Sequence, residues 1–392
     1  MGKYNFDEEI DRKNTDCLKY DFAREYGKRE GILPLWVADM DFRTAPEITD
    51  ALVERAKHGI FGYSDMKEDY FEALYHWFFT HFRWEIKKEW LVKTPGVVFA
   101  IAAAVRAFTN EGDGVLLCQP VYYPFTDCIL DNRRKLVNSQ LVYRDGQYVI
   151  DYEDFERKII ENHVTLFLLC SPHNPVGRVW TREELTRVGE ICLKHKVVVL
   201  SDEIHCDFTY EGFVHTPFAA ISEEFAKNSV ICTAPSKTFN LAGLQVSNIF
   251  IADEAKKKLF CKAVDAAGYS QLNVMGLVAA KAAYIYGEEW LCELKAYLAA
   301  NLSFVREFLK ENIPQIKLVE PQGLYLIWLD CSALGLSCEE LERLVSEKAN
   351  LWLDGGIMFG SETGQFQRIN IACTRKMLRQ AMEQLADAVR SV

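Results

Sequence analysis

The sequence lacks the features that define several protein classes. It has no run of about 18 uninterrupted apolar residues, so we expect no transmembrane helix. A net charge of −11 leaves no basic excess to bind nucleic-acid phosphate or an anionic membrane surface. Residues 1–8 are polar, which argues against a secretory signal peptide. Internal repeats and low-complexity linkers are also missing.

The cysteines do not form a metal-binding or disulfide pattern. There are 12 of them, but they are scattered singly, and none stands in a Cys-x-x-Cys pair or at the spacing of a zinc site. We therefore expect no metal centre. Reduced cysteines that are buried in a core are typical of cytoplasmic proteins, so we expect a cytoplasmic location.

Apolar runs alternate with amphipathic stretches through the middle of the chain. A length of 392 residues exceeds one ordinary core of about 100 to 200 residues and predicts two or three domains. Thr181 and Glu184 form a capping-box pattern that opens a helix over residues 181–195. Alternating strands and helices predict a mostly parallel sheet that is covered by helices. The predicted buried strands are residues 115–118, 165–170, 197–200, 230–232 and 248–251.

The pattern changes after residue 285. A long helical stretch, residues 288–312, precedes two strand-like segments, residues 324–330 and 366–373. The sequence therefore predicts an α/β fold with a large domain over residues 47–285 and a smaller α+β domain over residues 286–392. Residues 1–46 show no βαβ pattern, and we expect an arm that packs on the small domain or on a partner subunit.

Polar residues follow the predicted strands where ligands usually bind. In open parallel sheets, ligands bind beyond the carboxyl ends of the strands. Asn174 follows one strand, Asp202 follows the next, and the Ser236-Lys237 pair follows a third. Tyr122 and Tyr123 follow a fourth. One sheet edge is thus predicted to carry an amide, a carboxylate, an amine and two phenols.

This inventory suits an aldehyde cofactor, of which pyridoxal phosphate is the commonest. The amine of Lys237 would hold the aldehyde as a Schiff base. Asp202 would keep the pyridine nitrogen protonated, so that the ring acts as an electron sink. Asn174 would donate a hydrogen bond to the phenolic oxygen, and Tyr122 would stack on the ring.

Each of these residues also has an ordinary structural interpretation. Lys237 suits a solvated surface charge, Asn174 a turn and Asp202 a helix cap. Tyr122 and Tyr123 suit packing at the rim of the core, and His205 a buried histidine. Their combination at one predicted sheet edge, rather than any single residue, favours the cofactor site.

The chain resembles fold-type-I pyridoxal-phosphate enzymes of the aminotransferase class I/II superfamily. The Ser-Pro-x-Asn-Pro-x-Gly segment at residues 171–177, Asp202, Lys237 and Arg368 stand in that order and approximate spacing. More closely, it resembles the cystalysin-type carbon-sulfur β-lyases, the MalY/PatB group of cystathionine β-lyases. The resemblance spans essentially the whole chain. Its segments are residues 36–42, 61–63, 120–125, 171–180, 201–207 and 234–243.

The resemblance assigns the phosphate site and implies a homodimer. The turn of Gly96, Val97 and Val98 resembles the phosphate-binding turn of the family, where backbone N–H groups at a helix N-terminus suit a dianion. Ser236 adds a hydroxyl. Tyr63 resembles the tyrosine that reaches the phosphate in the neighbouring subunit, whereas the sequence without the resemblance places Tyr63 in the core.

The resemblance also assigns residues to the substrate. Arg368 matches the arginine that binds the α-carboxylate of an amino acid, where a planar guanidinium binds bidentately. Its ordinary interpretation is a surface arginine at a strand edge. Ala38 and Tyr123 are also assigned to the substrate.

The chain departs from many aminotransferases at two places. His205 stands three residues after Asp202, where many aminotransferases have a tyrosine and the cystalysin-like group has histidine. Residues 238–247 contain no arginine, although many relatives use one to bind the phosphate.

The predicted reaction is α,β-elimination from an L-cysteine derivative such as L-cystathionine or L-cysteine. Lys237 would remove the Cα proton, and Lys237, Tyr122 or Tyr123 would protonate the leaving thiolate. The products would be homocysteine or hydrogen sulfide, with pyruvate and ammonia. Two alternatives remain open: an aminotransferase, which uses the same residues, and a regulatory protein that binds a partner on the same fold.

Overall fold

The computed structural model describes residues 2–391, which divide into two compact units. Unit 1 comprises the residues up to Arg43, the short segment Pro175–Gly177 and the residues from Cys292 onward. Unit 2 comprises Thr44–Asn174 and Arg178–Leu291. No helix within residues 2–391 is both long and apolar enough to cross a membrane.

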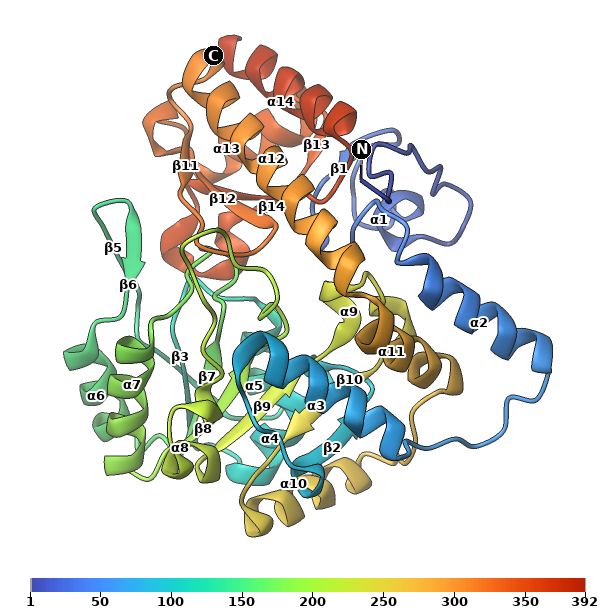
Figure 1. Cartoon of the computed structure of the whole chain (residues 1–392). Helices are drawn as coiled ribbons and strands as arrows, with labels where there is room; N and C mark the ends of the chain where they lie inside the picture. Colours follow the sequence, from blue (N-terminus) through green and yellow to red (C-terminus); the bar gives the residue numbers. More distant parts are fainter. Residues whose placement is uncertain (1, 392) are drawn as a thin grey trace. The chain divides into compact units, whose positions relative to one another are not determined.

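Unit 2 is built on a 7-stranded sheet in the order β2-β10-β9-β8-β7-β3-β4 (Figure 1). The five predicted strands are confirmed as β3, β7, β8, β9 and β10, and the sheet is mostly parallel. Strand β10 is antiparallel to both of its neighbours, which the sequence did not predict. The strands are β2 (Leu91–Thr94), β3 (Gly114–Leu117), β4 (Lys135–Asn138), β7 (Leu166–Cys170), β8 (Val198–Asp202), β9 (Ser229–Thr233) and β10 (Ser247–Phe250).

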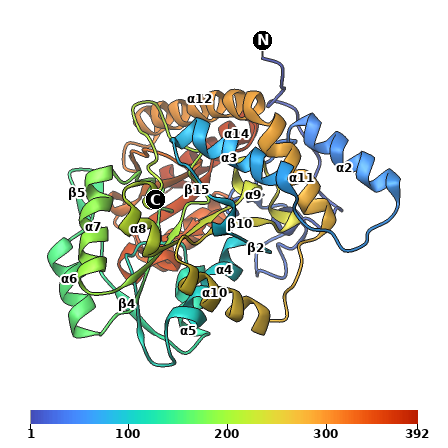
Figure 2. The same cartoon turned by 60° about the horizontal axis from the view of Figure 1, so that its bottom comes forward.

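Helices cover both faces of this sheet. The predicted helix at residues 181–195 is confirmed as α7, with Thr181 as its N-cap and a complete capping box to Glu184. Helices α4 and α10 lie side by side on one face (Figures 1 and 2). The helices of unit 2 are α2 (Pro46–His58), α3 (Glu68–Phe82), α4 (Val97–Phe108), α5 (Pro124–Leu130), α6 (Tyr152–Glu161), α7 (Arg182–Lys194), α8 (Glu223–Lys227), α9 (Pro235–Thr238), α10 (Glu254–Ala266) and α11 (Val274–Tyr286). A hairpin of β5 (Val142–Arg144) and β6 (Gln147–Val149) stands apart from the main sheet.

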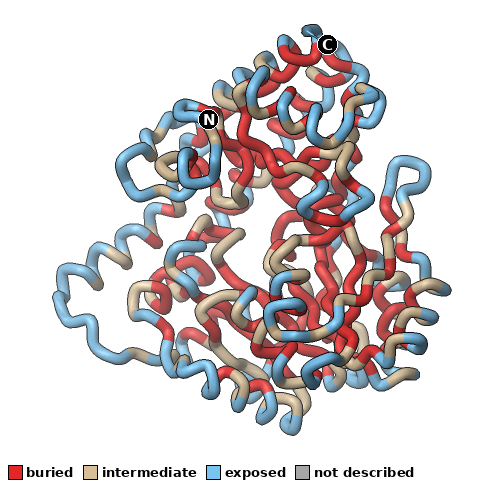
Figure 3. Tube along the Cα trace, turned by 180° about the vertical axis from the view of Figure 1, so that it is seen from behind, coloured by how far each residue is buried: buried red, intermediate tan, exposed pale blue. Residues whose placement is uncertain are grey.

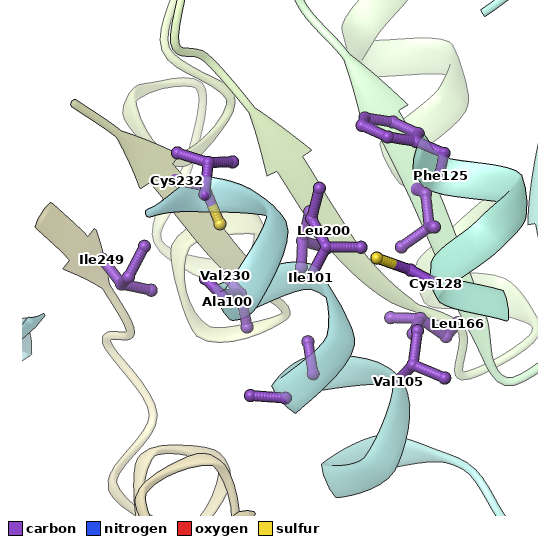
Figure 4. Close-up of a cluster of buried hydrophobic side chains, with 14 of the residues drawn as sticks. Ala100, Ile101, Val105, Phe125, Cys128, Leu166, Leu200, Val230, Cys232 and Ile249 are labelled. Atoms are coloured by element: carbon purple, nitrogen blue, oxygen red, sulfur yellow. The ribbon is translucent and has the colours of Figure 1, made fainter. Parts of the chain in front are cut away.

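Side chains alternate between the two faces of the sheet, as the period of a strand requires. Leu200 and Val230 point to the face that α4 covers, where Ile101 packs against them (Figure 4). The opposite face carries Phe250, whose ring lies 5.5 Å from that of Phe78 on α3. Because Asp202 is two residues after Leu200, the alternation places it on the α4 face. Strands β3, β7, β9 and β10 are buried at every residue, and Figure 3 shows buried stretches running through the interior of the trace.

Unit 1 contains a 4-stranded antiparallel sheet in the order β11-β12-β15-β14. The predicted helix at residues 288–312 is confirmed as α12 (Glu288–Asn312), whose first turn belongs to unit 2 and whose remainder, from Cys292, belongs to unit 1. The two predicted strands are confirmed as β12 (Leu326–Asp330) and β15 (Phe366–Asn370). The sequence missed β11 (Lys317–Val319) and β14 (Asp354–Gly355), which are short. A second pairing joins β1 (Leu33–Pro34) in parallel to β13 (Leu351–Trp352). The other helices are α1 (Leu18–Asp21), α13 (Cys338–Arg343) and α14 (Arg375–Arg390).

Candidate active site

Lys237 lies on the short helix α9, directly after β9. Ala234 is the extended N-cap of this helix, and Pro235 occupies its first turn, where proline favours helix initiation. The strand thus ends and the chain turns within a few residues, which carries Lys237 beyond the carboxyl end of β9. Its side chain is partly buried, and Ser236 beside it is partly buried as well.

Asp202 ends β8, the strand next to β9. It is 5% exposed, and burial raises the pKa of its carboxyl from 3.8 to about 7. The positive charge of Lys237 acts in the opposite direction and lowers this pKa, so the carboxyl and the amine are close enough to interact. The carboxyl oxygen Oδ1 also accepts a hydrogen bond of 3.1 Å from the N–H of Ile204.

Asn174 lies in the turn that follows β7, on the other side of β8. Its backbone N–H donates to the Cys170 sulfur at 3.4 Å, and the residue is 3% exposed. Cys170 is the register partner of Asp202 across the two strands. The turn after β7 therefore begins beside the end of β8, as the sequence predicts.

The two tyrosines and the histidine lie on the connections after β3 and β8. The rings of Tyr122 and Tyr123 are 5.4 Å apart, immediately before α5. Tyr122 packs against the hydrophobic core of the α4 face. His205 is 4% exposed in the turn that follows Asp202.

Helix α4 begins at the predicted phosphate-binding turn. Gly96 is its N-cap with a φ of 152°, a conformation that favours glycine. Val97 is 5% exposed and Val98 is 40% exposed. The first N–H groups of an α-helix have no partner within the helix and carry its positive dipole end, so this terminus suits an anion.

Tyr63 lies apart from these residues. Its side chain is 97% exposed, on a segment outside any helix or strand. The interpretation of Tyr63 as a core residue is therefore wrong.

Arg368 and Ala38 belong to unit 1 and lie close to each other there. Arg368 is 2% exposed on β15, which excludes the interpretation as a surface arginine. Its Nη2 forms an ion pair with Asp354 and donates to the backbone oxygen of Trp36 at 3.1 Å. Burial raises the pKa of Asp354, while the charge of Arg368 opposes the rise. Arg368 and Asp354 are direct register partners on β15 and β14.

The backbone around Ala38 is held by side chains of the same unit. Tyr325 donates its hydroxyl to the Ala38 oxygen at 2.8 Å. Asn370 donates to the oxygens of Val37 and Asp39 at 2.7 and 2.8 Å. These bonds hold the backbone at Ala38, the residue that the family resemblance assigned to the substrate, and at its two neighbours.

Sequence reasoning missed Asp354, Asn370 and Tyr325. Asn370 had a usable signal, because it stands two residues after Arg368 and so shares its face of a strand. Asp354 and Tyr325 had none, because their partners are distant in the sequence.

The residues of unit 2 suit three groups of pyridoxal phosphate: the pyridine nitrogen, the aldehyde and the phosphate. A buried carboxyl, which is costly to ionise alone, suits a protonated pyridine nitrogen. A partly buried lysine suits the aldehyde, and the α4 N-terminus suits the phosphate.

Comparisons with known proteins agree with this fit. The family model described as aminotransferase class I and II matches residues 30–385. Cystathionine beta-lyase PatB of Bacillus subtilis (strain 168) is 43% identical over 98% of this chain and 100% of its own length. Protein MalY of Escherichia coli (strain K12) is 32% identical over 99% of this chain and 100% of its own length.

A solved structure is also similar to this chain over nearly its whole length. Cystalysin from Treponema denticola, which contains a pyridoxal 5'-phosphate cofactor, is 36% identical, with a TM-score of 0.96 over 99% of each chain. The model match and the relatives span nearly the whole sequence, and the chain therefore belongs to the aminotransferase class I and II family.

Proposed function

We propose that this protein is a pyridoxal-phosphate-dependent carbon-sulfur lyase that acts on L-cystathionine and other L-cysteine S-conjugates. The observation that carries the proposal is the buried carboxyl of Asp202 within electrostatic reach of Lys237. The similarity of this chain to a cystathionine beta-lyase and to cystalysin supports carbon-sulfur cleavage over other reactions of the family. Overall, substrate and one water give a thiol, pyruvate and ammonia without net oxidation.

Residues of unit 2 would hold the cofactor. The Lys237 amine would hold the aldehyde group, and the Asp202 carboxylate would keep a proton on the pyridine nitrogen. Asn174 and His205 would contact the phenolic oxygen, and Tyr122 would stack on the ring. When bound, the cofactor supplies an electron sink for the pair that is released at the substrate Cα.

Backbone and hydroxyl donors would bind the phosphate. The N–H groups of Val97 and Val98 at the α4 N-terminus supply aligned dipoles, and Ser236 supplies a hydroxyl. Since residues 238–247 contain no arginine, the phosphate would be bound by these donors and by Tyr63.

Other side chains would bind the substrate and move protons. Arg368 binds the α-carboxylate, and its ion pair with Asp354 holds the guanidinium in place. Ala38 and Tyr123 would contact the substrate. The amine of Lys237 takes the Cα proton, and Lys237, Tyr122 or Tyr123 then protonates the sulfur as it leaves.

The reaction is tested by incubating the loaded protein with L-cystathionine and, separately, with an amino acid plus 2-oxoglutarate. We expect thiol and pyruvate from the first mixture. Formation of glutamate without thiol would instead establish an aminotransferase. If neither thiol nor glutamate formed, the result would favour a partner-binding role.

The cofactor bond has an independent test. Borohydride reduction followed by mass spectrometry should place the cofactor on the peptide that contains Lys237. The Lys237→Ala variant should carry no covalent cofactor. Attachment at another lysine would contradict the assignment.

We also propose a homodimer in which Tyr63 serves the partner's cofactor. The support is the exposure of Ile60, Phe61 and Tyr63, at 65%, 58% and 97%, on one segment. Mixing Tyr63→Ala with Lys237→Ala chains tests this, because one site of each hybrid dimer would combine an intact Lys237 with an intact Tyr63. Activity should reappear in the mixture, and its absence in proven hybrids would contradict the shared site.

We further propose a cytoplasmic location. All of the cysteines are free, and burial raises the pKa of the Cys170 and Cys192 thiols. Buried reduced thiols suit a reducing compartment. Cell fractionation with an antibody to the protein would test the location.

A further inference from the structure

Asp207 links the turn after β8 to helices α9 and α3 in unit 2. It is 7% exposed and lies five residues after Asp202, beyond the end of β8. Its Oδ2 accepts a hydrogen bond of 2.6 Å from the hydroxyl of Thr238 on α9. Its Oδ1 accepts one of 3.1 Å from the indole N–H of Trp77 on α3. Each carboxylate oxygen thus holds one donor from a separate element.

Thr238 is the residue after Lys237, so this bond acts next to the amine. Thr238 is 1% exposed, and its hydroxyl donates to a carboxylate, which is among the stronger hydrogen bonds of proteins. Helix α9 has 4 residues, too few to be stable on its own. The position of Lys237 therefore depends on tertiary contacts of its neighbours.

Trp77 contacts the same turn directly. Its ring lies 5.4 Å from that of Phe239, the residue after Thr238. The turn from Lys237 to Phe239 is thus fixed by a hydrogen bond and a ring contact, both from the Asp207–Trp77 pair.

Asp207 is also linked to Asp202 along the chain. The N–H of Cys206 donates to the Glu203 oxygen at 3.0 Å, and that of Phe208 donates to the His205 oxygen at 3.0 Å. These turns make residues 202–208 a compact segment. The same segment carries Asp202 at one end and the acceptor for Thr238 at the other.

We propose that Asp207 is a positioning residue that, through Thr238, sets the place of the Lys237 amine relative to Asp202. The inference rests on the proposed role of Lys237. Removing the hydrogen bond leaves both functional residues in place but frees the turn that carries the amine. Covalent capture of pyridoxal phosphate by the cofactor-free protein should then slow, because a displacement of about 1 Å at a reacting group costs up to about 100-fold in rate.

The test measures that capture with Thr238→Val, which replaces the hydroxyl by a methyl group of similar size. Cofactor-free protein is mixed with pyridoxal phosphate, reduced with borohydride at set times, and assayed for mass gain at Lys237. Thr238→Val and Asp207→Asn should each capture at least about 10-fold more slowly, while Thr238→Ser, which keeps the hydroxyl, should stay within about twofold. If Thr238→Val does not fold, Thr238→Ala against Thr238→Ser answers the same question.

Tyr70→Phe is the matched control. The hydroxyl of Tyr70 donates to Asn248 Oδ1 at 2.8 Å, a buried hydrogen bond of unit 2 that does not involve α9. Tyr70→Phe should lose about as much free energy of unfolding in urea as Thr238→Val. It should nevertheless capture the cofactor as fast as the wild type.

The outcomes separate this inference from the proposed function. Equal capture by wild type, Thr238→Val and Asp207→Asn, with stability alone reduced, would overturn the positioning role. Failure of the wild type to capture cofactor at Lys237 would instead overturn the proposed function.

Discussion

Replacing Asp202 with asparagine should stabilise the cofactor-free protein at pH 8, although it removes a proposed cofactor-binding group. Burial raises the pKa of the Asp202 carboxyl from 3.8 to about 7, with Lys237 opposing and Glu203 adding to the rise. Asparagine has nearly the same shape and keeps an oxygen for the Ile204 N–H. It carries no charge, so it avoids the cost of a buried carboxylate.

The direction of the pH dependence follows from proton binding. Between 3.8 and about 7 the folded carboxyl holds a proton that the unfolded one has lost, so the stability contributed by Asp202 falls as the pH rises through this interval. One pH unit is about 1.4 kcal/mol, which gives a total of about 4 kcal/mol above pH 7 and about 2 kcal/mol at pH 5. The advantage of Asp202→Asn should therefore grow by about 2–3 kcal/mol from pH 5 to pH 8.

Urea unfolding of the cofactor-free proteins, followed by tryptophan fluorescence at both pH values, measures this advantage. Asp50→Asn, on the exposed side of α2, controls for the change in net charge. With pyridoxal phosphate added, the order should reverse, because the wild type gains a partner for its carboxylate. An Asp202→Asn variant with no advantage at pH 8, or with the same advantage at pH 5, would refute the argument from burial.

Three substitutions and one exposed control test the contacts that support the site, each by the free energy of unfolding in urea. Leu200→Ala should cost about 2–5 kcal/mol because Leu200 is 0% exposed, whereas Leu259→Ala, at 51% exposed, should cost less than about 0.5 kcal/mol. Thr181→Ala should cost about 1 kcal/mol through loss of the capping box, and an unchanged value would mean that water replaces the cap. Gly177→Ala should cost more than about 1 kcal/mol, since Gly177 has a φ of +72° and its new Cβ would lie 2.7 Å from the Pro321 Cβ. A tolerated alanine there would show that the backbone shifts freely.

The sequence by itself determined the elements whose signals are local. Apolar runs predicted five strands of the unit 2 sheet, because a buried strand needs apolar residues on both faces. The Thr181 capping box and the long helix of residues 288–312 were equally local, since their stabilising contacts span only a few residues. The order of strands and helices also placed Lys237, Asp202 and Asn174 at one sheet edge, because parallel strands share the direction of their carboxyl ends.

The tertiary structure decided what depends on residues that are distant in the sequence. Strand β10 reads as an apolar run whichever way it points, and only its pairing with β2 and β9 makes it antiparallel. The exposure of Tyr63 and the ion pair of Arg368 with Asp354 are likewise set by packing. The bond between Asp207 and Thr238 spans 31 positions. Residue type reveals which groups are able to react, whereas folding decides which of them meet.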